Sequence, residues 1–157
     1  MSGLLVVHTD GGSRSNPGPA AYGVAAFFGD FTASHVVGAD PDQNRFEVFS
    51  LSEFIGTATN NDAEYRGLLG ALRSLPHWAE KTGATEVCIR LDSTLVVEQV
   101  LGRWKVKQET LKPYVQEARL LISQSVISIR LEYVPRAQNA RADALVNACL
   151  DSQNSSF

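Results

Sequence analysis

Four acidic residues stand at positions from which their carboxylates could act together. Asp10 and Asp92 each stand at the end of an apolar run that is typical of a buried strand. Glu64 and Asp143 lie in the first turns of predicted helices. Because the carboxyl ends of strands and the starts of helices share one side of an open α/β sheet, we expect the four carboxylates to converge in a cleft. Carboxylates at such short separations repel one another unless divalent cations neutralise their charge.

Ligand sets made of oxygen alone favour hard cations, so this cleft is predicted to bind two Mg²⁺ ions, with Mn²⁺ as the alternative. Two such ions, roughly 3.5–4 Å apart, would clamp a phosphodiester for in-line displacement by water. We therefore assign all four acids as candidate metal ligands and candidate catalytic residues. Each also has a simpler interpretation: Glu64 complements a helix dipole, Asp92 caps a helix, and Asp143 is a solvated helix residue.

The first of these acids follows the stretch around which the chain is organised. Within residues 4–9, both the odd-numbered and the even-numbered positions are mostly apolar. This pattern predicts a strand that is buried on both faces, with Asp10 at its carboxyl end. Gly11 and Gly12 come next, and without side chains they let another backbone, such as a sugar-phosphate chain, approach closely. A tight Asn-Pro-Gly-Pro connection then leads to a returning strand over residues 20–28. The alternative is a plain hairpin whose aspartate caps the turn.

The rest of the chain predicts an α/β architecture. The third, fourth and fifth strands of the sheet are predicted over residues 46–55 with a bulge, 87–91 and 127–134. Residues 31–37 are compatible with a short extra strand, followed by a loop over 38–44. Helices are predicted over residues 60–75, 93–101, 109–123 and 140–150, the first with Asn60 or Asn61 as N-cap and Pro76 as its stop. Three antiparallel strands followed by alternating strands and helices give a mixed five-stranded sheet with flanking helices. Residues 1–150 then form one domain, and residues 151–157 a frayed tail.

Composition places the chain among ordinary globular domains. Of its 157 residues, 44% are hydrophobic and 20% are charged. A chain of this length and composition can form one hydrophobic core that needs no disulfide or structural metal to stabilise it. No apolar run approaches the roughly 20 residues that cross a bilayer, and no secretory pattern is present, so we expect no membrane association. Cys88 and Cys149 lie in apolar patterns, which favours free thiols in a reducing cytoplasm. A net charge of −3 argues against binding nucleic acid through bulk positive charge, although not against binding through bridging metal ions.

Four sequence motifs resemble those of the type 1 ribonuclease H family, and they occur in that family's order. They are TDGGSRSNPGPAAYG at residues 9–23, TNNDAE at 59–64, LDS at 91–93 and NARADAL at 139–145. The resemblance covers most of the chain, implies the ribonuclease H-like fold, and matches the four acids to the family's metal-binding positions. It also implies an endonuclease that hydrolyses the RNA strand of RNA–DNA hybrids by a two-metal mechanism, leaving 5′-phosphate and 3′-hydroxyl ends.

The same resemblance implies which residues would contact the hybrid. Five are expected at sugars or base edges, and these are Gly11, Ser13, Asn16, Asn60 and Asn61. Thr59 is expected at a phosphate of the DNA strand. Amide and backbone groups suit this task because the 2′-hydroxyl of RNA both donates and accepts hydrogen bonds. Helix capping is the alternative role of the two neighbouring asparagines, and the two roles are compatible.

Two regions depart from the family pattern. Many bacterial members carry a histidine in the loop before the last helix, whereas residues 135–139 contain none and Arg136 is their only charged residue. Arg136 is therefore either a substrate contact or a plain solvated residue. The strongly basic protrusion of those members is short here, and Trp104 is surrounded by Arg103, Lys105, Lys107 and Lys112. Trp104 is predicted either to stack on a DNA-strand sugar or to pack, buried or half-exposed, against the protein.

Three functional hypotheses follow from these observations. The leading one is a monomeric, Mg²⁺-dependent ribonuclease that acts on RNA–DNA hybrids in the cytoplasm. One alternative is a DNA nuclease of the same fold, although such enzymes lack the glycine-rich turn paired with a Thr-Asn-Asn stretch. The other alternative is a nucleic-acid-binding module without catalysis, and the presence of all four acids argues against it.

Overall fold

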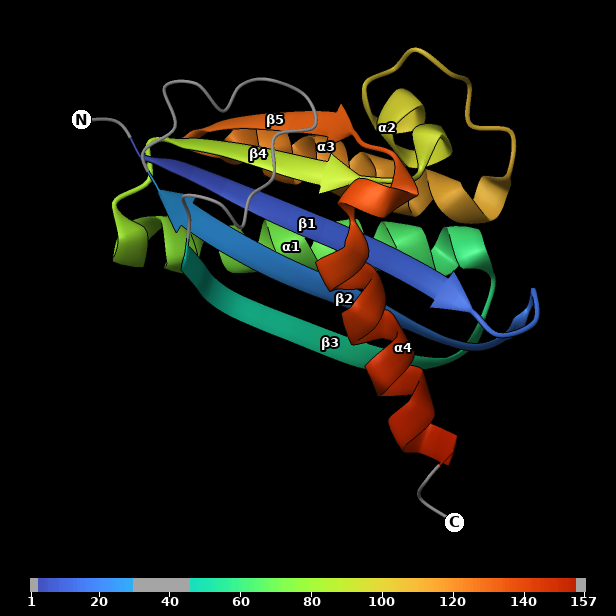
Figure 1. Cartoon of the computed structure of the whole chain (residues 1–157). Coiled ribbons are helices and arrows are strands. Elements are labelled where there is room, and N and C mark those ends of the chain that lie inside the picture. Colours follow the sequence, from blue (N-terminus) through green and yellow to red (C-terminus); the bar gives the residue numbers. More distant parts are fainter. Residues whose placement is uncertain (1–2, 30–45, 155–157) are drawn as a thin grey trace.

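The site residues are carried by a mixed five-stranded sheet with the strand order β3-β2-β1-β4-β5 (Figure 1). The computed structural model describes residues 3–29 and 46–154. The strands are β1 (Leu4–Ser13), β2 (Gly18–Gly29), β3 (Phe46–Ala58), β4 (Glu86–Leu91) and β5 (Ser128–Tyr133). β1 pairs antiparallel with β2, and β2 with β3, whereas the β1–β4 and β4–β5 pairs are parallel. The predicted α/β fold, with three antiparallel strands and then alternating strands and helices, is confirmed.

Helices cover both faces of this sheet. They are α1 (Asn60–Thr82), α2 (Thr94–Val100), α3 (Lys112–Gln124) and α4 (Ala140–Asn154), with short 3-10 turns at Glu109–Leu111 and Arg136–Gln138. α1 and α3 pack on one face, and α4 crosses the other (Figure 1). Among the residues that the structure describes, no helix is both long enough and apolar enough to span a bilayer.

Burial on both faces explains the continuously apolar sequence of β1. Leu5 and Val7 are buried in the main core with residues of α1 and α3, whereas Val6 is buried on the opposite side next to Cys88. α4 adds a smaller cluster in which Val146 packs against β2. Because close packing leaves a central strand little freedom, the residues at the carboxyl end of β1 have a defined position.

The helix that carries Glu64 begins differently from its prediction. Thr59, rather than Asn60 or Asn61, is the N-cap: its hydroxyl accepts from the Asp62 N–H at 3.1 Å, and Asp62 accepts from the Thr59 N–H at 3.3 Å. This capping box satisfies two backbone donors reciprocally. The predicted N-cap was wrong because both asparagines lack a free partner for a box: Asn60 Oδ1 accepts from the Ser13 N–H, and Glu64, three residues after Asn61, faces the acid cavity.

Pro76 does not end α1, whose C-cap is Gly83, a residue with a φ of +73°. A proline inside a helix removes a backbone hydrogen bond. Packing offsets this loss, because Ala79 remains buried and Trp78 stacks on Phe49 with ring centroids 4.6 Å apart. The predicted stop at Pro76 was therefore wrong.

β1 does not end at Asp10 as predicted. Its antiparallel pairing with β2 extends to Ser13, whereas its parallel pairing with β4 ends where Thr9 meets Leu91. Asp10 and Asp92 each come one residue after this last parallel pair, so they are neighbours at the point where the pairing of β1 with β4 ends. The register thus confirms that both acids stand at the same edge of the sheet.

α4 continues through Asn154, beyond its predicted end at Leu150. Residues 151–154 are therefore helical rather than frayed, and residues 155–157 of the predicted tail lie outside the described part. The strand and loop predicted within residues 31–44 also lie outside it. The other predicted strands and helices are confirmed, with ends that differ by no more than three residues.

Candidate metal centre and substrate cleft

Three carboxylates meet at the carboxyl edge of the central strands. Asp10 lies in β1, Asp92 directly follows β4, and Glu64 lies near the start of α1. In the described part of the chain, one oxygen from each of the three lies within 4.8 Å of the others. Asp10 is only 5% exposed, so little solvent screens this group. Three acids at such a separation remain ionised together only when a cation compensates their charge.

The position of Glu64 depends on Gly11. A β-carbon on Gly11 would overlap the backbone of Ala63 and the amide nitrogen of Glu64, so the missing side chain lets α1 lie directly on β1. A β-carbon on Gly12 would meet only the Val146 side chain, at 3.6 Å. The sequence predicted that these glycines admit a substrate backbone; the backbone that approaches Gly11 belongs to the protein itself.

The fourth predicted acid, Asp143, comes from the first turn of α4 and lines the same cavity as the other three. This cavity has a volume of about 380 Å³. Asp143 stands outside the tight group of three, and its side chain is 31% exposed. The structure therefore brings all four predicted acids to one cavity, with Asp143 on a more open side than Asp10.

Burial and mutual repulsion change the acidity of this cluster. Burial, followed by the neighbouring carboxylates of Asp92 and Asp143, raises the pKa of Asp10 to about 8. Burial, Asp10 and Asp92 also raise the pKa of Glu64 well above its ordinary value, and the Arg136 guanidinium opposes that shift. Without cations, the cluster therefore holds protons at neutral pH.

The cluster suits divalent cations because it leaves acceptor atoms unpaired. Among the residues described, Glu64 Oε2 and Asp92 Oδ1 are buried and accept no hydrogen bond. A buried carboxylate oxygen without a donor is costly, and a bound cation would remove that cost. The three grouped ligands offer carboxylate oxygens alone, which fit Mg²⁺ or Mn²⁺ better than a soft metal.

Amide groups fasten the β1–β2 hairpin to the start of α1. Asn60 accepts from the Ser13 N–H at 2.9 Å, and Asn16 accepts from the Asn60 N–H at 3.0 Å. Asn16 thereby satisfies one of the backbone donors that a helix start leaves free. Three of the five residues predicted to contact sugars or base edges line the acid cavity, and these are Gly11, Ser13 and Asn60.

Arg136 lines the acid cavity from the 3-10 turn that precedes α4. Its Nη2 lies 3.5 Å from Asp143 Oδ1, and its side chain is 80% exposed. An exposed pair at this distance stabilises the fold little. The guanidinium therefore adds a positive charge to the rim of an otherwise acidic cavity.

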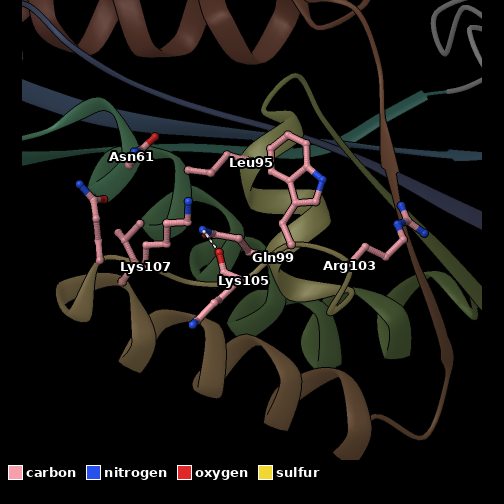
Figure 2. Close-up of a pocket in the computed structure, with 9 residues that line it drawn as sticks. Asn61, Leu95, Gln99, Arg103, Lys105 and Lys107 are labelled. Atoms are coloured by element: carbon pink, nitrogen blue, oxygen red, sulfur yellow. Dashed lines mark hydrogen bonds between the residues drawn. The ribbon is translucent and has the colours of Figure 1, made fainter.

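A second hollow, of about 490 Å³, contains two other predicted substrate residues, Asn61 and Trp104 (Figure 2). Three cationic side chains line it as well, and these are Arg103, Lys105 and Lys107. Trp104 is 47% exposed, which excludes a core position and leaves stacking on a substrate or half-exposed packing as its role. Thr59 and Asn16 line neither hollow.

Sequence reasoning missed several residues that complete the acid cavity. Arg14 pairs with Asp151 at 2.6 Å, and Asn147 donates to the Asp143 carbonyl at 3.1 Å. Arg14 lies inside the motif at residues 9–23, which could have drawn attention to it. Tyr133 and Asn147 carried no local signal, because the cavity forms only when β5 and α4 come together.

A mixed five-stranded sheet with acids from β1, α1, α4 and the end of β4 in one cavity defines the ribonuclease H-like class. Comparisons with known proteins then give the family. Residues 30–149 match the family model described as "Reverse transcriptase-like". The chain is 46% identical over 149 residues to the bifunctional protein Rv2228c of Mycobacterium tuberculosis, a match that covers 94% of this chain and 36% of that protein. It is 37% identical over 149 residues to ribonuclease HI of Halobacterium salinarum, covering 95% of this chain and 65% of that protein.

Solved structures agree with these relatives. The N-terminal RNase H domain of Rv2228c from Mycobacterium tuberculosis superposes with a TM-score of 0.78 at 42% identity, covering 99% of both chains. LC11-RNase H1 in complex with an RNA/DNA hybrid superposes with a TM-score of 0.78 at 36% identity, covering 95% of this chain and 98% of that one. This chain therefore belongs to the type 1 ribonuclease H family, a family of hydrolytic endoribonucleases, and the predicted family is confirmed. It spans 36% of the length of the mycobacterial relatives that it matches.

Proposed function

We propose that this chain is a metal-dependent endoribonuclease that hydrolyses the RNA strand of RNA–DNA hybrids. The observation that carries the proposal is the cluster of Asp10, Glu64 and Asp92, whose oxygens lie within 4.8 Å of one another while two buried ones accept no hydrogen bond. Family membership supports this reaction. We further propose two cations per site, Mg²⁺ with Mn²⁺ as a substitute, and products with 5′-phosphate and 3′-hydroxyl ends.

The surroundings of the four acids support different roles for them. Asp10 is their common neighbour, because it interacts with Asp92 and Asp143 and also raises the pKa of Glu64. Asp10, Glu64 and Asp92 would therefore hold the cations together, and the half-buried Glu64 and Asp92 would each offer a buried oxygen that accepts no hydrogen bond. Asp143 would complete the set on the side that substrate and water can reach. Bound divalent cations would activate the attacking water and stabilise the leaving oxygen.

The RNA strand is proposed to lie along the hairpin and the start of α1. Gly11, Ser13 and Asn60 line the acid cavity there. The Asn60 oxygen already accepts from the Ser13 N–H, so its amide nitrogen is the group that would meet a 2′-hydroxyl. Asn16 would act by holding Asn60 in place, through its bond to the Asn60 N–H. The solved complex of LC11-RNase H1 with an RNA/DNA hybrid supports this class of substrate.

The DNA strand is proposed to follow the second hollow. Stacking on the half-exposed Trp104, together with the ammonium groups of Lys105 and Lys107, would suit a sugar-phosphate strand. Asn61 lines the same hollow and would add a polar contact. A phosphate contact from Thr59 would compete with the capping box, because its hydroxyl lies 2.9 Å from the Asp62 carboxylate.

Arg136 is proposed to contact the substrate phosphate where other family members carry a histidine. It is exposed and close to Asp143, at 3.5 Å. An arginine stays protonated near neutral pH, so it cannot take up a proton as a histidine can. Its contribution would therefore be a fixed positive charge rather than proton transfer.

We also propose that the protein acts as a monomer in the cytoplasm, without membrane association. Cys88 and Cys149 are both free thiols, which suits a reducing compartment. Light scattering of the purified protein should give the mass of one chain, and a mass of two chains would contradict the monomer.

The test of the proposed function is cleavage of an end-labelled RNA–DNA hybrid in Mg²⁺, Mn²⁺ or chelator, beside Asp92→Asn. We expect cuts in the RNA strand that require a cation and that are lost in this variant. Glu80→Gln is the matched control, because Glu80 is an exposed acid elsewhere on α1. Cleavage of duplex DNA instead would favour the DNA nuclease, and binding of the hybrid without cleavage would favour the binding module.

A further inference from the structure

We infer that Asn139 is a positioning residue that holds Asp143 at the correct distance from Asp10. The inference rests on the proposed function, because it concerns how one candidate metal ligand is placed relative to another. Asn139 is the first residue of the motif at residues 139–145. It has no carboxylate, so the metal-binding role proposed for the four acids does not explain it. Its contacts indicate a structural role within the site.

The side chain of Asn139 is fully buried, at 0% exposure, and uses both ends of its amide. Nδ2 donates to the carbonyl oxygen of Thr9 at 2.9 Å, and Oδ1 lies 3.0 Å from His8 Nδ1. A carbonyl only accepts, so the amide has one possible orientation and His8 carries a proton on Nδ1. Asn139 therefore holds the two residues of β1 that immediately precede Asp10.

The backbone of Asn139 holds the other partner. Its carbonyl accepts from the Asp143 N–H at 3.1 Å, a helical hydrogen bond at the very start of α4. The two residues are one helical turn apart. A displacement of Asn139 would therefore displace Asp143 by a similar distance. A single buried residue thus connects the strand of one acid to the helix of another.

Two other polar contacts of α4 are weaker determinants of its position. Arg141 pairs with Glu47 at 2.7 Å, and Asp151 pairs with Arg14 at 2.6 Å. Both pairs are partly exposed to solvent, where ion pairs contribute little and tolerate rearrangement. A buried amide with both ends satisfied tolerates much less, because any shift leaves polar atoms unpaired away from water.

Asp143 is the acid that most needs such a support, because it stands outside the tight group of three. Without the Asn139 amide, the start of α4 would lose its buried polar link to β1 and keep only its apolar packing on the sheet. We expect cation affinity and kcat to fall roughly 10-fold, the lower end of the effects seen for groups that orient metal ligands. The KM for the hybrid should stay unchanged, because the hairpin and the second hollow keep their structure.

The experiment compares Asn139→Ala, Asn139→Ser and Gln138→Ala with the wild-type chain. Gln138 is an exposed amide residue next to Asn139 and is the matched control. Serine remains a favourable residue at a helix start but is too short to reach both partners on β1. Calorimetric titration with Mn²⁺ alone measures cation affinity without substrate, and thermal unfolding in chelator measures folding. Steady-state cleavage of the hybrid then separates kcat from KM.

Weaker Mn²⁺ binding in both Asn139 variants than in Gln138→Ala, with lower kcat and unchanged KM, is the expected result. A lower Tm with unchanged Mn²⁺ affinity would show a purely structural role and overturn the inference, as would failure of both variants to fold. If only the alanine variant fails to fold, the serine variant decides by the same criteria. A wild-type chain that binds no Mn²⁺ would instead contradict the proposed function, so the two failures are distinguishable.

Discussion

The backbone of Ala63 occupies the space in which a side chain on Gly11 would stand. α1 therefore lies directly on β1 at the point where Glu64 comes close to Asp10. Acidic residue types alone do not make the carboxylate cluster. It also requires a contact between two backbones that only a glycine permits.

Replacing Gly11 by alanine should push α1 away from β1 and separate Glu64 from Asp10. Overpacking of this kind costs about 1–3 kcal/mol of stability. A displacement of about 1 Å at a catalytic group costs roughly 100-fold in rate. We expect Gly11→Ala to show both losses, measured as Tm and as hybrid cleavage. Gly12→Ala is the control, since its β-carbon would meet only Val146 at 3.6 Å, and equal losses in both variants would contradict the prediction.

The raised pKa of Asp10 predicts that the cation-free protein loses stability as the pH rises. Folding shifts this pKa from 3.8 to about 8, so the folded state retains a proton that the unfolded state releases. The contribution is fully present below the unfolded pKa and disappears as the pH approaches the folded one. The shift at Glu64 has the same direction. In chelator, Tm should therefore decrease between about pH 5 and about pH 8.

Asp10→Asn is the control for this pH dependence, because an amide does not titrate in that range. Its Tm in chelator should decrease less with pH than that of the wild-type chain. Mg²⁺ should raise the wild-type Tm more at about pH 8 than at about pH 5, because protons compete with the cation at the lower pH. A wild-type Tm that changes with pH no more than that of the variant would show that the carboxyl of Asp10 is not perturbed.

Removal of the charge on Arg136 should slow cleavage without unfolding the protein. Arg136→Ala should lower kcat roughly 10-fold, near the strength of one charge-assisted hydrogen bond. Because the side chain is 80% exposed, Tm should change little. Arg136→Lys should be faster than Arg136→Ala but slower than the wild-type chain. Lysine keeps the positive charge but lacks the planar guanidinium that donates two parallel hydrogen bonds. The control is Arg73→Ala, another exposed arginine, and identical kinetics in all three variants would exclude the contact.

Trp104 should contribute to substrate affinity rather than to catalysis. Stacking of a base or sugar on an aromatic ring contributes about 1–3 kcal/mol, so Trp104→Ala should raise the KM for the hybrid roughly 10-fold. Mn²⁺ affinity should be unchanged, because the second hollow is lined by none of the four acids. Phe46→Ala removes another exposed aromatic ring, 81% exposed on β3, and should leave KM as it is. Equal effects of the two substitutions would favour half-exposed packing as the role of Trp104.

Several parts of the site could be predicted from the sequence because their signals are local. Asp10 and Asp92 each follow an apolar run, and parallel strands of one sheet bring their carboxyl ends together. Glu64 lies near a helix start that an adjacent Thr-Asn-Asn stretch marks, although the residue that caps it proved to be Thr59. Asp143 likewise lies in the first turn of a helix whose amphipathic pattern is readable along the chain.

Only the tertiary structure decided how these pieces meet. The contact of Gly11 with Ala63, the Asn139 amide between β1 and α4, and the continuation of α1 past Pro76 all depend on partners distant in sequence; His8 and Asn139 are 131 residues apart. Local periodicity reports whether a residue is buried, but not which atoms surround it. The sequence by itself therefore determined the order of the elements and the identity of the acids. Packing between those elements determined the separation of the carboxylates, on which cation binding depends.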